Sequence, residues 1–193
     1  MLNELTRKNR SYRRFYQSEY VSVETLRELV NLARLSPTEA NFQELKYILS
    51  NDPEKNDAIF SCLKWAGFLK DWDGPAEGER PAAYIIIVKD TAIMQRTGID
   101  HGIAAQSILL GATEKGLGGC MLQSVDKDTL REAFTIDPQF EILLVIALGR
   151  PSEEIIIDEI DNGESTKYWR DEKGRHHVPK RKLDDIIIET HGN

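Results

Sequence analysis

The chain has 193 residues, of which 40% are hydrophobic and 30% charged, a balance typical of soluble globular proteins that excludes fibres and disorder. Its formal net charge of −7 argues against a general nucleic-acid binder, because Lys and Arg hold most phosphate backbones. It leaves room for one local basic pocket around a small phosphate ligand. Without a signal-peptide pattern or a membrane-length apolar run, we expect a cytoplasmic protein with no membrane partner. Two cysteines and four histidines, none at ligand spacing, predict neither a disulfide scaffold nor a metal site.

The first third of the chain predicts a helix, a strand and a second helix. Ser22 is a good helix N-cap, and the apolar residues after it follow the spacing of one buried face: Leu26, Leu29, Val30 and Ala33. Ser36-Pro37 ends this helix. We expect a short strand at 47–49 and a helix over 54–69. Residues 71–81 are rich in Gly, Pro and acidic side chains and predict a loop long enough to form a lid or a mobile edge.

The middle of the chain predicts a buried sheet. The apolar runs 83–88 and 142–148 are typical of strands that are covered on both faces. A helix over 100–115 is apolar almost all round and is therefore expected at the centre. Residues 118–122 form another expected strand, and Asp126 caps a short helix that ends near Phe134. This alternation predicts an α+β fold, layered as an α/β/α sandwich around the sheet.

The last quarter of the chain differs in character. Residues 152–177 are polar and show little periodicity, whereas Ile186-Ile187-Ile188 reads as a final strand. A strand so far from the other apolar runs favours pairing at a sheet edge, on this chain or on a partner chain. We therefore treat 1–193 as a single domain whose segment 152–193 is extended and pairs at a sheet edge of this chain or of a partner subunit.

Arg10-Ser11-Tyr12-Arg13 is a candidate phosphate-binding segment. The planar donor fork of Arg grips two phosphate oxygens at once, and a Ser hydroxyl adds a further hydrogen bond. The alternative is a solvated basic helix end, and for this segment alone that interpretation is the more common one.

Three further segments are weak signals when each is taken alone. The turn 36–43 is rich in side chains that bond to backbone or ligand, but a connecting loop has the same composition. The pair Gly118-Gly119 lets the backbone approach a flat ligand, although it stands at a helix-to-strand turn, unlike the dinucleotide fingerprint. The cluster 179–182 looks like an exposed charge run, yet together with Arg10 and Arg13 it would neutralise a phosphate monoester.

Taken together, five motifs in this order resemble the nitroreductase family of FMN enzymes. They are Arg10-Ser11-x-Arg13-x-Phe15, Ser36-Pro37-x-x-x-Asn41-x-Gln43, Asp100-x-Gly102-x-Ala104-Ala105-Gln106, Gly116-Leu117-Gly118-Gly119 and Leu148-Gly149-Arg150-Pro151. The resemblance runs from Arg10 to the Lys180-Arg181 pair. It implies an intertwined homodimer with C-terminal strand exchange and two FMN sites at the subunit interface, in agreement with the extended tail.

The resemblance also implies roles for individual residues. The implied contacts to the FMN phosphate and ribityl chain are Arg10, Ser11, Arg13, Lys180 and Arg181. The implied contacts to the ring or its edge, from the other subunit, are Pro37, Thr38, Asn41 and Gln43. Backbone N–H groups near Gly118 and Gly119 would approach the ring and tune its redox potential. Glu39 departs from the family's small residues and would place a carboxylate near the ring.

The implied activity is an FMN-dependent oxidoreductase with NADH or NADPH as hydride donor. In a ping-pong cycle through flavin N5, it would reduce a small-molecule acceptor such as a nitroaromatic or a quinone. No side chain needs to act as a nucleophile, so no catalytic residue is assigned. Two alternatives stay open: a flavin protein of the same fold with a non-nitro substrate (reductive dehalogenase or dehydrogenase), and a flavin carrier or sensor without steady turnover. Cys120, which begins a buried strand, is expected to be a small core residue rather than a reactive thiol.

Overall fold

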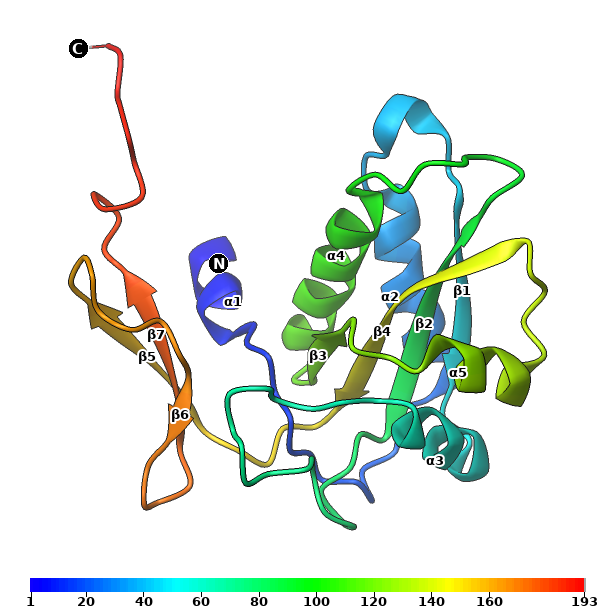
Figure 1. Cartoon of the computed structure of the whole chain (residues 1–193), viewed down its shortest axis with the longest axis horizontal. Coiled ribbons are helices and arrows are strands. Elements are labelled where there is room, and N and C mark those ends of the chain that lie inside the picture. The colour runs from blue at the N-terminus through cyan, green and yellow to red at the C-terminus, as the bar shows by residue number, and fades with distance from the viewer. Residues whose placement is uncertain (193) are drawn as a thin grey trace.

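A four-stranded antiparallel sheet forms the centre of the fold, with the strand order β1-β2-β4-β3 (Figure 1). Its strands are β1 (Leu45–Ser50), β2 (Ala83–Asp90), β3 (Gly118–Leu122) and β4 (Phe140–Gly149). The helices covering one face are α2 (Val23–Leu35) and α4 (Asp100–Glu114), and those covering the other are α3 (Pro53–Ser61) and α5 (Lys127–Phe134). The computed structural model describes residues 1–192, and it confirms the predicted three-layer α+β sandwich.

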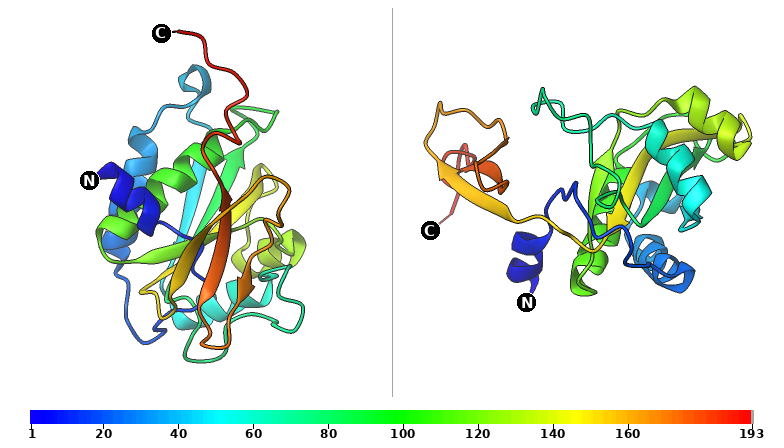
Figure 2. Two further views of the ribbon diagram at one scale, coloured as in Figure 1. Left: turned by 90° about the vertical axis from the view of Figure 1, so that its left-hand side faces the viewer. Right: turned by 90° about the horizontal axis from the view of Figure 1, so that it is seen from below.

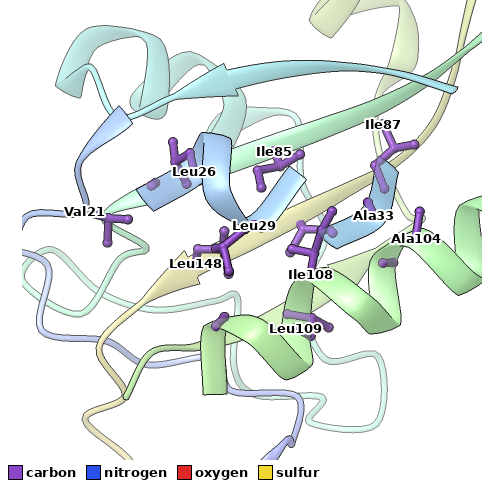
Figure 3. Packing of buried hydrophobic residues seen from close by; sticks show 14 of the residues in the cluster. Val21, Leu26, Leu29, Ala33, Ile85, Ile87, Ala104, Ile108, Leu109 and Leu148 are labelled. Atoms are coloured by element: carbon purple, nitrogen blue, oxygen red, sulfur yellow. The ribbon is translucent and has the colours of Figure 1, made fainter. Parts of the chain in front are cut away.

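Strand β2 lies in the interior of the sheet, and all eight of its residues are buried. Because successive side chains of a strand point to opposite faces, Ile85 and Ile87 pack with α2 and α4, whereas Tyr84 and Ile86 pack with α3 and α5. Figure 3 shows the first of these two cores. Helices on both faces explain why the strand reads as a continuous apolar run although its neighbours are antiparallel.

Helices α2 and α4 pack side by side on one face of the sheet. The Ser22 hydroxyl accepts a 3.0 Å hydrogen bond from a backbone N–H and caps α2, as predicted. Leu29 and Ile108 are fully buried between the two helices (Figure 3). At the other end of α2, Ser36 Oγ lies 2.7 Å from Ser107 Oγ, which ties the start of the next loop to α4. No helix within residues 1–192 is both long and apolar enough to span a membrane.

A second, smaller sheet stands apart from the sandwich (Figure 2). It consists of β5 (Ile155–Ile160), β6 (Trp169–Arg170) and β7 (His176–Arg181) in the order β5-β7-β6. Strands β5 and β7 are parallel, and β6 and β7 are antiparallel. The first helix, α1 (Leu2–Lys8), lies between this sheet and α4 (Figures 1 and 2).

The structure corrects two predicted elements. The helix expected over 54–69 ends at Ser61, because the backbone then turns to pair with the segment before α5. Lys64 N donates to Ser124 O at 3.0 Å, and Asp126 N donates to Cys62 O at 2.8 Å. The strand expected at 186–188 does not form within this chain: these residues form a turn and irregular chain, and no strand among residues 1–192 pairs with them. Its pairing with a partner chain stays a prediction.

The strands of the C-terminal region lie instead in β5, β6 and β7, mostly within residues 152–177, whose sequence shows little periodicity. Pairing supplies the reason. Ile155–Ile160 runs alongside His176–Arg181 in a parallel ladder, and backbone hydrogen bonds to a neighbour define a strand more than side-chain alternation does.

Replacing Gly119 in β3 with Ala should lower the free energy of unfolding by about 1–3 kcal/mol. A Cβ atom there would stand 2.5 Å from Ala147 O and 2.6 Å from a methyl carbon of Leu109. The matched control is Gly102→Ala in α4, where a Cβ would meet nothing within 4 Å and Ala favours the helix by up to about 1 kcal/mol. Urea unfolding measures both. Equal stability of the two variants would contradict this packing argument.

Candidate functional site

A buried carboxylate anchors the segment that carries Arg10, Ser11 and Arg13. The Glu153 side chain is only 2% exposed. Its oxygens accept hydrogen bonds from the backbone N–H groups of Arg13 and Arg14, the latter at 3.2 Å, and from the Arg170 guanidinium at 3.1 Å. Charge-assisted bonds of this kind are stronger than neutral ones. The backbone at residue 13 is therefore fixed to the start of the C-terminal region.

The same segment also runs along the edge strand β3. Ser11 forms a parallel bridge with Gly119, and Tyr12 N donates to Gly119 O at 3.0 Å. Held on both sides, the side chains of residues 10–13 project from a defined backbone.

These side chains face a cavity of about 360 Å³ between the N-terminal segment, α4, β3 and the small sheet. Four of the predicted phosphate-site residues line it: Arg10, Ser11, Arg13 and Lys180. Its volume is within the range of small-molecule sites. Two guanidinium groups, an ammonium group and a hydroxyl around one cavity favour an anionic ligand with several oxygens.

Strand β7 supplies one wall of this cavity through a single face. His176, Val178 and Lys180 all line the cavity, as the two-residue period of a strand requires. Arg181 does not line it, because its side chain points to the opposite face. Of the predicted pair Lys180 and Arg181, the structure therefore places Lys180 alone at this cavity.

Arg13 makes three contacts inside the cavity wall. Its guanidinium carbon lies 4.7 Å from the centre of the Tyr168 ring. Its Nη1 atom donates to Ser11 O at 3.2 Å and lies 3.2 Å from His176 Nε2. Burial, followed by the charges of Arg13, Arg170 and His177, lowers the pKa of His176 to about 4. The imidazole is therefore neutral at neutral pH.

The residues after α2 form a second, separate cavity of about 210 Å³. Pro37, Thr38 and Gln43 line it, whereas Asn41 does not. Within one chain the structure thus does not bring these residues together with Arg10 and Arg13. Asp100 Oδ2 accepts a 2.8 Å hydrogen bond from Glu39 N and fixes the loop.

The backbone of this loop is strained. Ala40, Asn41 and Gln43 have φ angles of 46°, 57° and 55°, a left-handed region that residues other than glycine rarely adopt. Strained backbone of this kind is common in ligand-binding loops, where the surrounding structure holds it in place. The Glu39 carboxylate is not a lone charge, because it forms an ion pair with Arg96.

Gly118 and Gly119 are both buried inside the chain. A Cβ at Gly118 would stand 2.4 Å from the Tyr12 ring, so packing within the chain already requires glycine at both positions. Their approach to a flavin ring stays a prediction. Cys120 is confirmed as a core residue: it is buried, and burial raises the pKa of its thiol.

Sequence reasoning missed Tyr168, His176 and Glu153. Nothing in the polar segment 152–177 distinguishes them by composition, because their roles depend on the position of the small sheet. The period-two pattern in residues 176, 178 and 180 is the one signal that was available for His176.

Comparison with known proteins places this chain in a protein family. The sequence model of the Nitroreductase family matches residues 6–150. The chain belongs to the nitroreductase family. It is 20% identical over 182 residues, covering 78% of this chain and 88% of the relative, to MhqN of Bacillus subtilis, which is named as an NAD(P)H nitroreductase.

Solved structures share the nitroreductase fold. An FMN-dependent nitroreductase from Clostridium difficile R20291 is 26% identical, with a TM-score of 0.65 over 80% of this chain and 89% of that chain. A protein from Desulfovibrio desulfuricans, described as a nitroreductase in complex with FMN, is 21% identical. Its TM-score is 0.70 over 100% of this chain and 98% of that chain.

In this nitroreductase-family chain, replacing Glu153 with Ala should lower the free energy of unfolding by about 3–5 kcal/mol, because Arg170 keeps a buried charge without its partner. The matched control is Glu154→Ala, an exposed neighbour for which a change within about 0.5 kcal/mol is expected. Urea unfolding measures both variants. A small effect at Glu153 would show that Arg13 and Arg14 do not depend on this anchor.

Acid should destabilise the chain through His176. The unfolded imidazole takes up a proton near pH 6.5, whereas the folded one resists protonation until about pH 4. Its contribution, present above pH 6.5, is lost as the pH falls towards 4 and amounts to at most about 3 kcal/mol. His176→Asn should abolish this part of the pH dependence of unfolding. Identical slopes between pH 6.5 and 4 in both proteins would contradict it.

Proposed function

We propose that this chain is an FMN-dependent oxidoreductase that uses NADH or NADPH to reduce a small acceptor such as a nitroaromatic or a quinone. The observation that carries the proposal is the single cavity lined by Arg10, Ser11, Arg13 and Lys180 in a chain of the nitroreductase family. The relatives support it, because one is named for NAD(P)H and two solved structures carry FMN in their descriptions.

The residues of the cavity fit an FMN phosphate by the chemistry of their donors. Arg10 and Arg13 offer planar forks, Lys180 offers a compact positive charge, and Ser11 offers a hydroxyl. In this proposal, Arg13 binds the phosphate in an orientation set by Glu153 and Tyr168. Bound FMN would supply hydride-transfer chemistry that no side chain of the protein provides. The protein's own part is to bind and orient.

The proposed functional unit is a homodimer in which the loop 36–43 of one subunit completes the site of the other. Two observations support it. Pro37 and Arg13 line different cavities of one chain, so one chain does not assemble the whole predicted site. The apolar residues Leu183 and Ile186–Ile188 are exposed, and a partner subunit would cover them.

Purified protein should bind FMN, and Arg13→Ala should weaken that binding about 10- to 100-fold, which corresponds to the loss of a charged hydrogen bond. Arg7→Ala is the matched control, because Arg7 is exposed at the end of α1 and does not line the cavity. Fluorescence titration with FMN measures both variants. Equal binding would place the phosphate elsewhere.

The proposed oxidoreductase activity is tested separately, by flavin absorbance in the same sample. The flavin absorbance of the wild-type protein should bleach when NADH or NADPH is added without oxygen, and an added quinone should restore it. Wild-type protein that takes up no FMN would overturn the proposed function.

A further inference from the structure

His176 is the one residue of the cavity wall that is at once fully buried, titratable and incompletely hydrogen bonded. It lies on β7 at 0% exposure and lines the cavity together with Lys180. Its Nδ1 atom is buried and has no hydrogen-bond partner within residues 1–192. A buried polar group without a partner costs stability, so its presence calls for an explanation.

The neighbouring Arg13 decides which ring nitrogen carries the proton. Arg can only donate, and its Nη1 lies 3.2 Å from His176 Nε2, so Nε2 is the acceptor. A neutral imidazole has one acceptor and one donor, which puts the proton on Nδ1. The low pKa of His176 agrees with a neutral ring, because burial and the charges of Arg13, Arg170 and His177 all oppose protonation.

We propose that His176 is a further ligand-binding residue of this cavity, whose Nδ1–H donates a hydrogen bond to a phosphate oxygen of the ligand. The same ring holds the Arg13 guanidinium through Nε2, so His176 both binds and positions. This inference rests on the proposed function, since the phosphate is that of FMN.

The other polar groups of the wall explain why a neutral donor belongs here. Arg10, Arg13 and Lys180 already supply positive charge to the cavity. A fourth cation would repel Arg13, whereas a neutral N–H adds a directional hydrogen bond without adding positive charge. The Tyr168 ring packs against both groups, with its centre 5.2 Å from the His176 ring and 4.7 Å from the Arg13 guanidinium carbon. This contact holds the pair in one orientation.

The first test reads the tautomer directly in the protein without ligand. Long-range proton–nitrogen NMR spectra of the full chain at neutral pH should show His176 protonated on Nδ1, with the signal identified by its loss in His176→Asn. Addition of FMN should shift this Nδ1–H signal, and riboflavin, which lacks the phosphate, should not. A ring protonated on Nε2, or an Nδ1–H signal that FMN leaves unchanged, would overturn the inference.

The second test separates the two hydrogen bonds by substitution. Asn keeps an N–H donor near the Nδ1 position, Gln keeps a carbonyl acceptor near the Nε2 position, and Phe keeps neither. The preference for FMN over riboflavin should fall about 10- to 100-fold in His176→Gln and His176→Phe, and less in His176→Asn. His177→Asn is the matched control, because that neighbour stacks on Trp169 on the opposite face.

The outcomes keep this inference apart from the proposed function. If the wild-type protein binds no FMN, the proposed function fails, and the tautomer alone still tests the Arg13 contact. If the wild-type protein binds FMN and His176→Phe retains its full preference over riboflavin, only the role of His176 fails.

Discussion

The candidate site depends on one buried carboxylate. Glu153 follows directly after the main sheet, and its oxygens receive two backbone N–H groups and one guanidinium. A carboxylate at 2% exposure is tolerated only when donors replace the lost water, and here the donors are Arg13, Arg14 and Arg170. This contact joins the cationic segment to the start of the C-terminal region, and the contacts of Arg13 with Tyr168 and His176 add to it.

The small sheet, which lies outside the sandwich, forms one wall of the cavity. Tyr168, just before β6, and His176 of β7 both contact Arg13, and the guanidinium carbon of Arg170 in β6 lies 4.2 Å from the centre of the Trp72 ring. Phe68 packs on Tyr168 with ring centres 5.1 Å apart. The segment between α3 and β2, which includes the predicted loop 71–81, therefore contacts the same residues that position Arg13. Loop, sheet and cationic segment form one connected group.

An element could be predicted when the residues that define it lie close together in the sequence. Ser22 and its helix, the strand over 83–88 and the layered architecture depend on caps, periodicity and apolar runs, which are local, and all are found. The predicted continuation of the helix beyond Ser61 is wrong because the backbone there pairs with Ser124, some sixty residues away. The terminal Ile run forms no strand within residues 1–192, because apolar composition makes a strand only where another strand offers hydrogen bonds.

The sequence by itself determined the family, the class of fold and the cationic residues Arg10, Arg13 and Lys180, because ordered motifs and residue chemistry are written along the chain. Only the tertiary structure decided that Lys180 and not Arg181 faces the cavity, that Pro37 and Arg13 line different cavities, and that His176 and Glu153 belong to the wall. These facts depend on which strand face points inward and on how a separate sheet is anchored. Both are set by contacts between residues far apart in the chain, which no local pattern records.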